Sequence, residues 1–522
     1  MTRAAIAAVA AAALLAAAAG AVYLWSGATL AGDASALARI DLQPFAGSVE
    51  RVRATGPGGR PIPLDVAGGR LTPTTRVTPG EEVSVAVVVK RPGWSSWLLG
   101  KERRESLTVH APVAHVRSRW LTARPGAPPP RVRFDTPVSS VSFGHVRVPV
   151  GGASVAVPAK SGAGSIDMAV AARSWERLGA SVKVTWFPPA SGPVVLASPP
   201  PGAQIDPSAS LRLTFSQPIS EVLGSTQPTL SPGVPGRWLQ TDSHTLEFRS
   251  SGFGAHFASN LQLRFPHTVD VSSATGDTAD PSRAIRWTVA PASFLRLQQL
   301  LAEQGYLPLA WSPDADEVPR TAGAQLAAAV DPPAGRFTWR YPNTPHELQE
   351  LWRLGEPNTI VRGAVMMFQD EHGLTVDGIA GADVWHALLV DAVAGKQRRD
   401  GYSYVFVHRN VPQLLTLWHN GDVVLTSPGN TGVPAAPTAL GTFPVFEHIP
   451  VGTMSGNNPD GSHYNDPGIR WISYFHGGEA LHAFNRNSFG TPQSLGCVEL
   501  PLASAAKVWP YTPIGTLVTI ED

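Results

Sequence analysis

Cysteine and net charge are both scarce in this chain of 522 residues. It holds 1 cysteine, so no disulfide can form within one chain. Lys and Arg number 41 against 40 Asp and Glu, which gives a formal net charge of +1. Without a basic excess, no nucleic-acid partner is expected. A hydrophobic content of 43% excludes global disorder, and 50 Gly with 49 Pro suit short strands joined by many turns.

Charge is also absent from the stretch that follows Arg3, over residues 4–25. A membrane-spanning helix needs about 20 apolar residues, whereas the apolar part of a signal peptide has about 7–15. We therefore interpret residues 1–34 as a signal or membrane anchor. The length favours an anchor and membrane contact, and a cleaved signal stays open. Both interpretations place the rest of the chain outside the cytoplasm.

Short apolar runs separated by Gly and Pro fill residues 37–290 and predict strands. The sequence of residues 131–139 is similar to that of residues 212–220, which indicates repeated sandwich modules. The run at 198–206 and the strands after it resemble bacterial immunoglobulin-like modules. The predicted domains, which we interpret as spacers, are two β-sandwich-like units at 35–116 and 117–196 and an immunoglobulin-like unit at 197–291.

From Ser293 the spacing of apolar residues becomes that of a helix, which Gly305 would end. Two more helices are predicted over 360–371 and from Ala382, joined by the loop Asp377-Gly-Ile-Ala-Gly381. This combination resembles the three-helix peptidoglycan-binding domain, here over residues 292–396. Residues 310–358 stand as an insertion between the first two helices.

Strands return after a charged linker at 396–400. Asn420-Gly421 between two apolar runs is a strong hairpin signal. Further strands are predicted at 441–446 and 516–520, so residues 401–522 form a mostly β domain. The predicted fold class is multidomain and mostly β, with sandwiches first, then a small helical domain, then this β-rich domain.

The single thiol lies in a chemically suggestive context. Cys497 follows Gly496, which lets the backbone bend so that neighbouring amides converge on an oxyanion. His482 lies upstream, at the end of an apolar run that reads as a strand. A thiol and a base are the minimum for cysteine nucleophilic catalysis, because the thiolate attacks and a base must generate it.

The wider pattern resembles the L,D-transpeptidase catalytic domain over residues 402–522. His482 is followed at a distance by Ser494-Leu-Gly-Cys497, and Pro437-Thr438 precedes Gly441-Thr-Phe443. The resemblance implies a cysteine acyltransferase that needs no cofactor. The enzyme would be exported to the cell wall and would take part in wall construction and in setting cell shape. Its partners would be peptidoglycan stem peptides as donor and acceptor, joined by 3→3 cross-links, and carbapenem-type β-lactams would inhibit it.

The resemblance also assigns roles to residues. Cys497 would be the nucleophile and His482 the base, oriented by the carbonyl of Ala483. The amides of Gly496 and Cys497 would form the oxyanion hole beside Ser494. Tyr464, at the spacing of an assisting tyrosine in some members, would lend its hydroxyl.

Two positions depart from the family pattern. Leu495 replaces the usual histidine, which changes the polarity of the pocket. Glu499 replaces the usual Arg or Asn, and Arg486 is a candidate to compensate it. Since positions i and i+2 of a strand share a face, Glu499 is expected beside Cys497, where it would repel a free donor carboxylate. An imidazolium at His482 is expected to offset its effect on the thiol.

Three alternatives stay open. The same acyl-enzyme could be hydrolysed, giving an L,D-carboxypeptidase, or the chain could be a non-catalytic wall-binding protein. A zinc peptidase could use His463, Asp466, His476 and His482, but no short ligand pair of the kind that zinc enzymes use occurs, so no metal site is expected.

Overall fold

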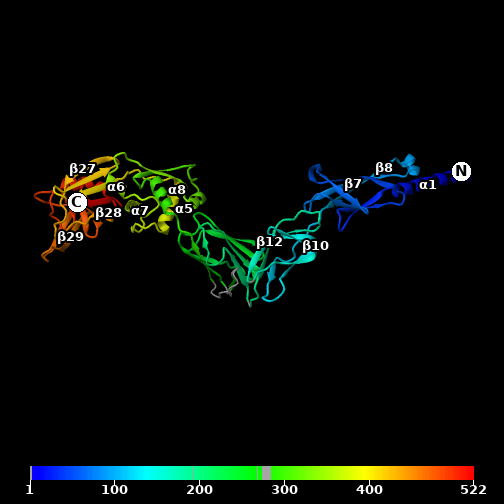
Figure 1. Ribbon diagram of the computed structural model, residues 1–522, viewed down its shortest axis with the longest axis horizontal. Coiled ribbons are helices and arrows are strands. Elements are labelled where there is room, and N and C mark those ends of the chain that lie inside the picture. The colour runs from blue at the N-terminus through cyan, green and yellow to red at the C-terminus, as the bar shows by residue number, and fades with distance from the viewer. Residues whose placement is uncertain (1–2, 161, 191, 267–268, 273–283) are drawn as a thin grey trace.

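The computed structural model describes residues 3–522 except 161, 191, 267–268 and 273–283, so the parts of the predicted domains at those positions lie outside the described residues. The chain is a row of units with its N-terminus at one end and its C-terminal domain at the other (Figure 1). Strands outnumber helices along most of it, which confirms the multidomain, mostly β fold class.

The N-terminal stretch is one continuous helix, α1 (Arg3–Leu24), without a buried residue. It is the one helix in the described part of the chain whose length and composition would let it cross a membrane, and a signal sequence would meet the same criteria. Figure 1 places it at the opposite end of the molecule from the C-terminal domain.

The first β unit is a sandwich of two four-stranded sheets, ordered β1-β2-β6-β5 and β4-β3-β7-β8. Alternate valines of β7 are buried in its core, as expected of a strand with one face inside. The elements are β1 (Ala28–Gly32), β2 (Ala38–Leu42), β3 (Ser48–Thr55), η1 (Pro57–Gly59), β4 (Pro61–Ile62), β5 (Leu64–Ala67), β6 (Arg70–Pro73), β7 (Glu82–Lys90), α2 (Gly93–Leu99) and β8 (Glu102–His110).

The second β unit differs from the sandwich predicted over 117–196. Its described strands form one five-stranded sheet, ordered β11-β10-β12-β13-β9. The long strand β10 pairs with β11 from its start but with β12 only from Ser140 onward, with register shifts between. Such irregularities bend a strand, so one sheet can enclose a core. The strands are β9 (Trp120–Thr122), β10 (Arg131–Phe143), β11 (Val146–Ala156), β12 (Gly164–Ala171) and β13 (Val182–Phe187).

The third β unit has two sheets, ordered β18-β19-β16-β14-β21 and β15-β22-β20-β17. The repeated segment diverges here, because β16 ends at Phe215 whereas β10 continues through Pro137. The elements are β14 (Val194–Ser198), β15 (Gln204–Ile205), β16 (Leu211–Phe215), α3 (Ile219–Val222), β17 (Thr229–Ser231), β18 (Gly236–Asp242), β19 (Thr245–Ser250), β20 (Asn260–Arg264), β21 (Asp270–Ser272) and β22 (Ala284–Val289).

The three predicted helices are confirmed as α4 (Phe294–Glu303), α7 (Thr359–Glu371) and α8 (Ala382–Ala394). Gly305 follows α4 with a φ of +84°, as expected of a residue that ends a helix. The predicted insertion contains helices and strands of its own. Its elements are β23 (Leu309–Pro313), α5 (Ala322–Val330), β24 (Gly335–Trp339) and α6 (His346–Glu350), with β23 and β24 paired antiparallel.

The C-terminal domain packs a sheet ordered β27-β26-β25-β33-β28 against one ordered β29-β30-β31-β32. The predicted hairpin is confirmed, since Asn420 and Gly421 both have positive φ between β26 and β27. The elements are β25 (Ser403–His408), β26 (Leu414–His419), β27 (Asp422–Pro428), β28 (Gly441–Pro444), β29 (Glu447–Asn457), β30 (His463–His476), β31 (Glu479–Ala483), β32 (Val498–Leu500), α9 (Leu502–Val508), η2 (Trp509–Tyr511) and β33 (Leu517–Glu521).

The helical and C-terminal domains share one hydrophobic core. Tyr404, Trp418 and Leu517 are buried in the same cluster as side chains of α4, α7 and α8. The predicted linker belongs to this interface, because Arg398 donates from Nε to Glu371 Oε1 at 2.7 Å. The two domains therefore form one packed unit, with β33 lying against α7.

Gly363 of α7 makes the closest approach in this interface. A Cβ added there would lie 2.5 Å from the carbonyl oxygen of Gly515. We expect Gly363→Ala to lower the free energy of unfolding by about 1–3 kcal/mol, because the backbones must separate. Gly323→Ala in α5 is the matched control, since its Cβ would meet nothing within 4 Å. Denaturant unfolding of both variants measures the difference, and equal stabilities would contradict the close contact.

Candidate active site around Cys497

Cys497 stands at the end of a tight turn that leads into β32. Gly496 has a φ of +112°, which favours glycine, and a Cβ there would lie 3.2 Å from Glu479 Cγ. The thiol is half-buried, with Sγ 3.7 Å from the carbonyl oxygen of Gly478. The turn thus presents the thiol beside the start of β31.

His482 comes from β31, the parallel neighbour of β32, and is only 3% exposed. Its Nδ1 lies 3.0 Å from the carbonyl oxygen of Ala483. A carbonyl only accepts, so Nδ1 carries the proton and Nε2 is left as the basic nitrogen. His482 is paired in register with Glu499, and alternate strand residues share a face. Cys497, Glu499 and His482 therefore lie on one face of the sheet.

The surroundings of Cys497 and His482 favour the uncharged form of both side chains. Burial raises the pKa of the Cys497 thiol to about 12, and the carboxylates of Glu499 and Glu479 add to the rise while the amide of Ala480 opposes it. Burial lowers the pKa of His482, although its bond to Ala483 and the charge of Glu499 act the other way. At neutral pH the site holds a thiol and a neutral imidazole. The expected offset by an imidazolium is therefore wrong, because burial disfavours that cation.

These pKa directions predict the pH profile. If His482 deprotonates Cys497 during attack, kcat/KM should fall only when the pH drops below the ordinary histidine value of 6.5, where the lowered pKa protonates the base. The thiol stays protonated up to about 12, so no thiol titration should appear near neutral pH. Thiolate absorbance measured against a Cys497→Ala blank checks this. A thiolate signal at pH 7 would contradict the neutral pair.

Ser494 secures the turn from inside. Its buried hydroxyl donates to the carbonyl of Cys497 at 2.5 Å and accepts from the amide of Gly496 at 3.3 Å. In the described part of the chain, the Cys497 amide has no hydrogen-bond partner. Of the two amides expected to form an oxyanion hole, that of Gly496 is thus already engaged, and that of Cys497 is available.

Two tyrosines of β30, Tyr464 and Tyr474, lie within electrostatic reach of the thiol. Burial raises the pKa of both Tyr464 and Tyr474, and Cys497 is the next cause in each case. Tyr464 also covers Gly456 of the neighbouring strand β29. The thiol therefore acts electrostatically on the expected Tyr464, and also on Tyr474, which belongs to the same cluster as Cys497 and which the sequence did not single out.

Glu499 does not face the substrate as expected. It is only 4% exposed, and Arg486 binds it through two bonds, Nε to Oε2 at 2.8 Å and Nη2 to Oε1 at 2.6 Å. Arg486 also donates to the carbonyl of Gln493 at 3.1 Å. The expected repulsion of a donor carboxylate is wrong, because the charge is buried and paired. The pair instead joins the segment before the turn to β32.

Leu495 is half-buried at the tip of the turn, and a leucine supplies no polar group to the pocket.

The residues of the zinc alternative do not assemble. Within the described ranges, no group of three or more His, Cys, Asp or Glu could hold a metal ion. His463 lies 3.3 Å from Asn457, and His476 lies 3.2 Å from Glu479.

Asn430 is a positioning residue that sequence reasoning missed. Its fully buried side chain accepts from the amide of Gly490 at 3.0 Å, and its backbone exchanges two hydrogen bonds with that of Glu499. Gln413 fixes Thr431, the residue after Asn430, because its Oε1 accepts from the Thr431 amide at 2.8 Å. No local motif marks either side chain, because their partners are far away in sequence.

Residues 402–520 match the family of L,D-transpeptidase catalytic domains, and residues 355–388 match a peptidoglycan binding domain family. These matches confirm both resemblances. The second match covers α7 and about half of α8, and leaves α4 and residues 310–354 of the insertion outside it. No curated protein matches the chain.

Solved structures of L,D-transpeptidases are similar to this chain at low identity. One from Mycobacterium smegmatis is 12% identical, with 62% of this chain and 97% of that chain covered and a TM-score of 0.22. L,D-transpeptidase 3 from Mycobacterium tuberculosis, bound to a faropenem-derived adduct, is 11% identical, with coverages of 62% and 97% and a TM-score of 0.21. The E. faecium catalytic domain is 23% identical, with coverages of 23% and 96% and a TM-score of 0.21.

Proposed function

We propose that this chain is a peptidoglycan L,D-transpeptidase that forms 3→3 cross-links through an acyl-enzyme on Cys497. The family match of residues 402–520 supports acyl transfer. The observation that carries the catalytic assignment is the bond from His482 Nδ1 to Ala483 O at 3.0 Å, which leaves Nε2 free on the face that holds Cys497.

In the first half-reaction, Cys497 Sγ attacks the carbonyl between the diamino acid and the terminal D-alanine of a tetrapeptide. The thiol proton passes to His482 Nε2 as the C–S bond forms. The developing oxyanion is held by the Cys497 amide, with the hydroxyl of Tyr464 as a further donor. His482 then protonates the leaving nitrogen, the C–N bond breaks, and D-alanine leaves a thioester behind.

In the second half-reaction, the side-chain amine of another stem attacks the thioester carbonyl. His482 takes a proton from this amine as the C–N bond forms, and returns it to sulfur as the C–S bond breaks. Attack by water instead would give the carboxypeptidase outcome. A carbapenem would acylate Cys497 through its strained amide, whose C–N bond opens as the C–S bond forms.

The test is incubation of the full chain with a disaccharide tetrapeptide, followed by mass spectrometry. Loss of D-alanine with cross-linked dimers supports transpeptidation. Loss of D-alanine without dimers indicates hydrolysis. No change in the substrate would indicate a wall-binding protein without activity and would overturn the proposal.

A groove beside the Asp377–Gly381 loop is the proposed wall-binding surface. The loop is held by Gln369, whose Oε1 accepts from the amides of Asp377 and Gly378 at 3.0 and 2.9 Å. A mainly apolar cavity of about 750 Å³ lies next to it, lined by α4, α7, α8 and the third β unit. Phe257 of that unit contacts Trp385 of α8, with ring centroids 5.4 Å apart.

Ile379 offers a test of this groove, because it lines the cavity and is 65% exposed. We expect Ile379→Ser to weaken co-sedimentation of the full chain with insoluble peptidoglycan by about tenfold, since an apolar contact of this size is lost. Val423→Ser in β27, 61% exposed and away from the groove, is the control. Equal binding of both variants would contradict a role for the groove.

The proposed location is outside the cytoplasm, with α1 as the membrane anchor. The three β units lie between α1 and the C-terminal domain in the elongated chain (Figure 1). As spacers they would hold the catalytic domain away from the membrane and near the wall.

A further inference from the structure

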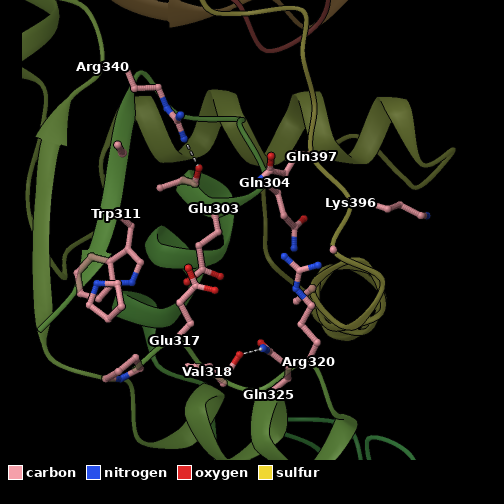
Figure 2. A pocket seen from close by; sticks show the side chains of 16 residues that line it. Glu303, Gln304, Trp311, Glu317, Val318, Arg320, Gln325, Arg340, Lys396 and Gln397 are labelled. Atoms are coloured by element: carbon pink, nitrogen blue, oxygen red, sulfur yellow. Dashed lines mark hydrogen bonds between the residues drawn. The ribbon is translucent and has the colours of Figure 1, made fainter. Parts of the chain in front are cut away.

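The insertion builds a second cavity, of about 290 Å³, away from both Cys497 and the loop of Gly381. Its wall combines the end of α4 with β23 and the segment before α5, and the end of α8 closes it. Figure 2 shows Glu303 and Glu317 in the middle, Trp311 to one side, and Gln304 and Arg320 to the other. The residues that line this cavity lie outside the matched family segments, so neither match assigns this site a ligand.

Two carboxylates line the acidic part of the cavity, those of Glu303 and Glu317, and among the described residues only Glu303 is paired with a cation. Arg296 is fully buried and pairs with Glu303 at 2.9 Å. Burial raises the pKa of Glu303, and the charge of Glu317 adds to that rise while Arg296 opposes it. Glu317 has no hydrogen bond or ion pair to another described residue. A bound cation would relieve the repulsion between the two acids.

The opposite part of the cavity presents one guanidinium, that of Arg320, and one amide oxygen, that of Gln304, without partners among the described residues. Arg320 is exposed and forms no hydrogen bond or ion pair within the described part of the chain. Gln304 is 3% exposed and donates from Nε2 to the carbonyl of Leu388 at 2.8 Å, while its buried Oε1 lacks a partner. The other lining cations are engaged, Arg340 with the carbonyl of Leu309 and Lys396 with Asp391.

This arrangement of opposite charges indicates a ligand with two charged ends. We propose that the cavity binds a short peptide or amino-acid derivative that carries a primary ammonium group and a carboxylate. The ammonium lies between Glu303 and Glu317 with Trp311 at its side, where carboxylates and an aromatic face both stabilise a cation. The carboxylate pairs with Arg320, whose planar fork suits it. This binding does not depend on acyl transfer at Cys497.

Calorimetric titration of the full chain with Nα-acetyl-lysine tests the proposal, because this probe carries one ammonium and one carboxylate. We expect Glu317→Gln and Arg320→Gln each to weaken its binding by about tenfold, the effect of losing one charge-assisted contact. Asp316→Asn and Arg336→Gln are matched controls, because both residues are exposed and do not line the cavity. Both controls should bind the probe as the unaltered chain does.

Nα,Nε-diacetyl-lysine, which lacks the ammonium, should not bind. The proposal would be overturned by no binding of Nα-acetyl-lysine at about 10 mM, by equal binding of the diacetylated compound, or by equal losses in the control variants. Preferential binding of a neutral N-acetylated sugar would likewise assign the cavity to a different ligand class. None of these results bears on transfer by Cys497, which is measured separately.

Discussion

Cys497→Ala should abolish acyl transfer, with a loss of at least about a thousandfold, because no other group can form the covalent intermediate. The domain should stay folded, since Cys497 is half-buried at the edge of a small cluster and loses only one sulfur atom. Mass spectrometry with the disaccharide tetrapeptide measures the loss, and a carbapenem should add mass to the unaltered chain but not to the variant.

Cys497→Ser is the matched control for shape, because oxygen replaces sulfur with little change in volume. It should be as inactive as the alanine variant, since a serine hydroxyl is a much weaker nucleophile without stronger activation. Full turnover by Cys497→Ala, or loss of activity with a chelator in the unaltered chain, would contradict the thiol mechanism and revive the zinc alternative.

The sequence was most informative where the chemistry is local. Asn420-Gly421 predicts its hairpin because a two-residue turn needs positive φ values, and Asn and Gly are the residues that adopt them most readily. The turn before Cys497 is similar, since Gly496 supplies a conformation that other residues disfavour. The bond from His482 to the carbonyl of the next residue is local as well.

Long-range features could not be obtained in this way. Glu499 and Arg486 are paired through folding of the segment between them, and the burial of Glu499 inverts the role expected from its spacing alone. The charged run at 396–400 reads as a linker, yet Arg398 is held against Glu371. Burial by distant elements also decides that the site holds a neutral thiol and imidazole.

The sandwich predicted for the second β unit differs from the structure for another reason, and no elements were predicted within the insertion. Residues 131–139 and 212–220 are similar because each contains the start of a strand. However, β10 continues past Pro137, whereas β16 ends at Phe215, before the equivalent Pro218. In the insertion, the Ala-rich stretch after Thr321 is a helix signal, and Thr321 caps α5 by accepting from the amide of Ala324. That signal could have predicted α5, whereas the cavity beside it depends on packing against α4 and α8.

Arg486→Gln should lower the free energy of unfolding by about 2–4 kcal/mol. Removing one partner of a buried ion pair leaves an uncompensated charge, here on Glu499, which is 4% exposed. The estimate lies below that for a fully buried pair because the Arg486 side chain is 31% exposed. Transfer should fall as well, since Glu499 is paired in register with His482. Denaturant unfolding and the tetrapeptide assay measure the two effects.

The double variant Arg486→Gln/Glu499→Gln separates charge from packing. With both charges removed, the two amides can bond to each other, so most of the lost stability should return. Arg39→Gln is the surface control: Arg39 pairs with Asp41 at 2.8 Å, but both side chains are more than half exposed, and such pairs contribute at most about 1 kcal/mol. If the double variant is no more stable than Arg486→Gln, the buried charge is not the cause. The guanidinium would then act through its stacking on Phe484, 4.6 Å from the ring centroid, and through its bond to Gln493.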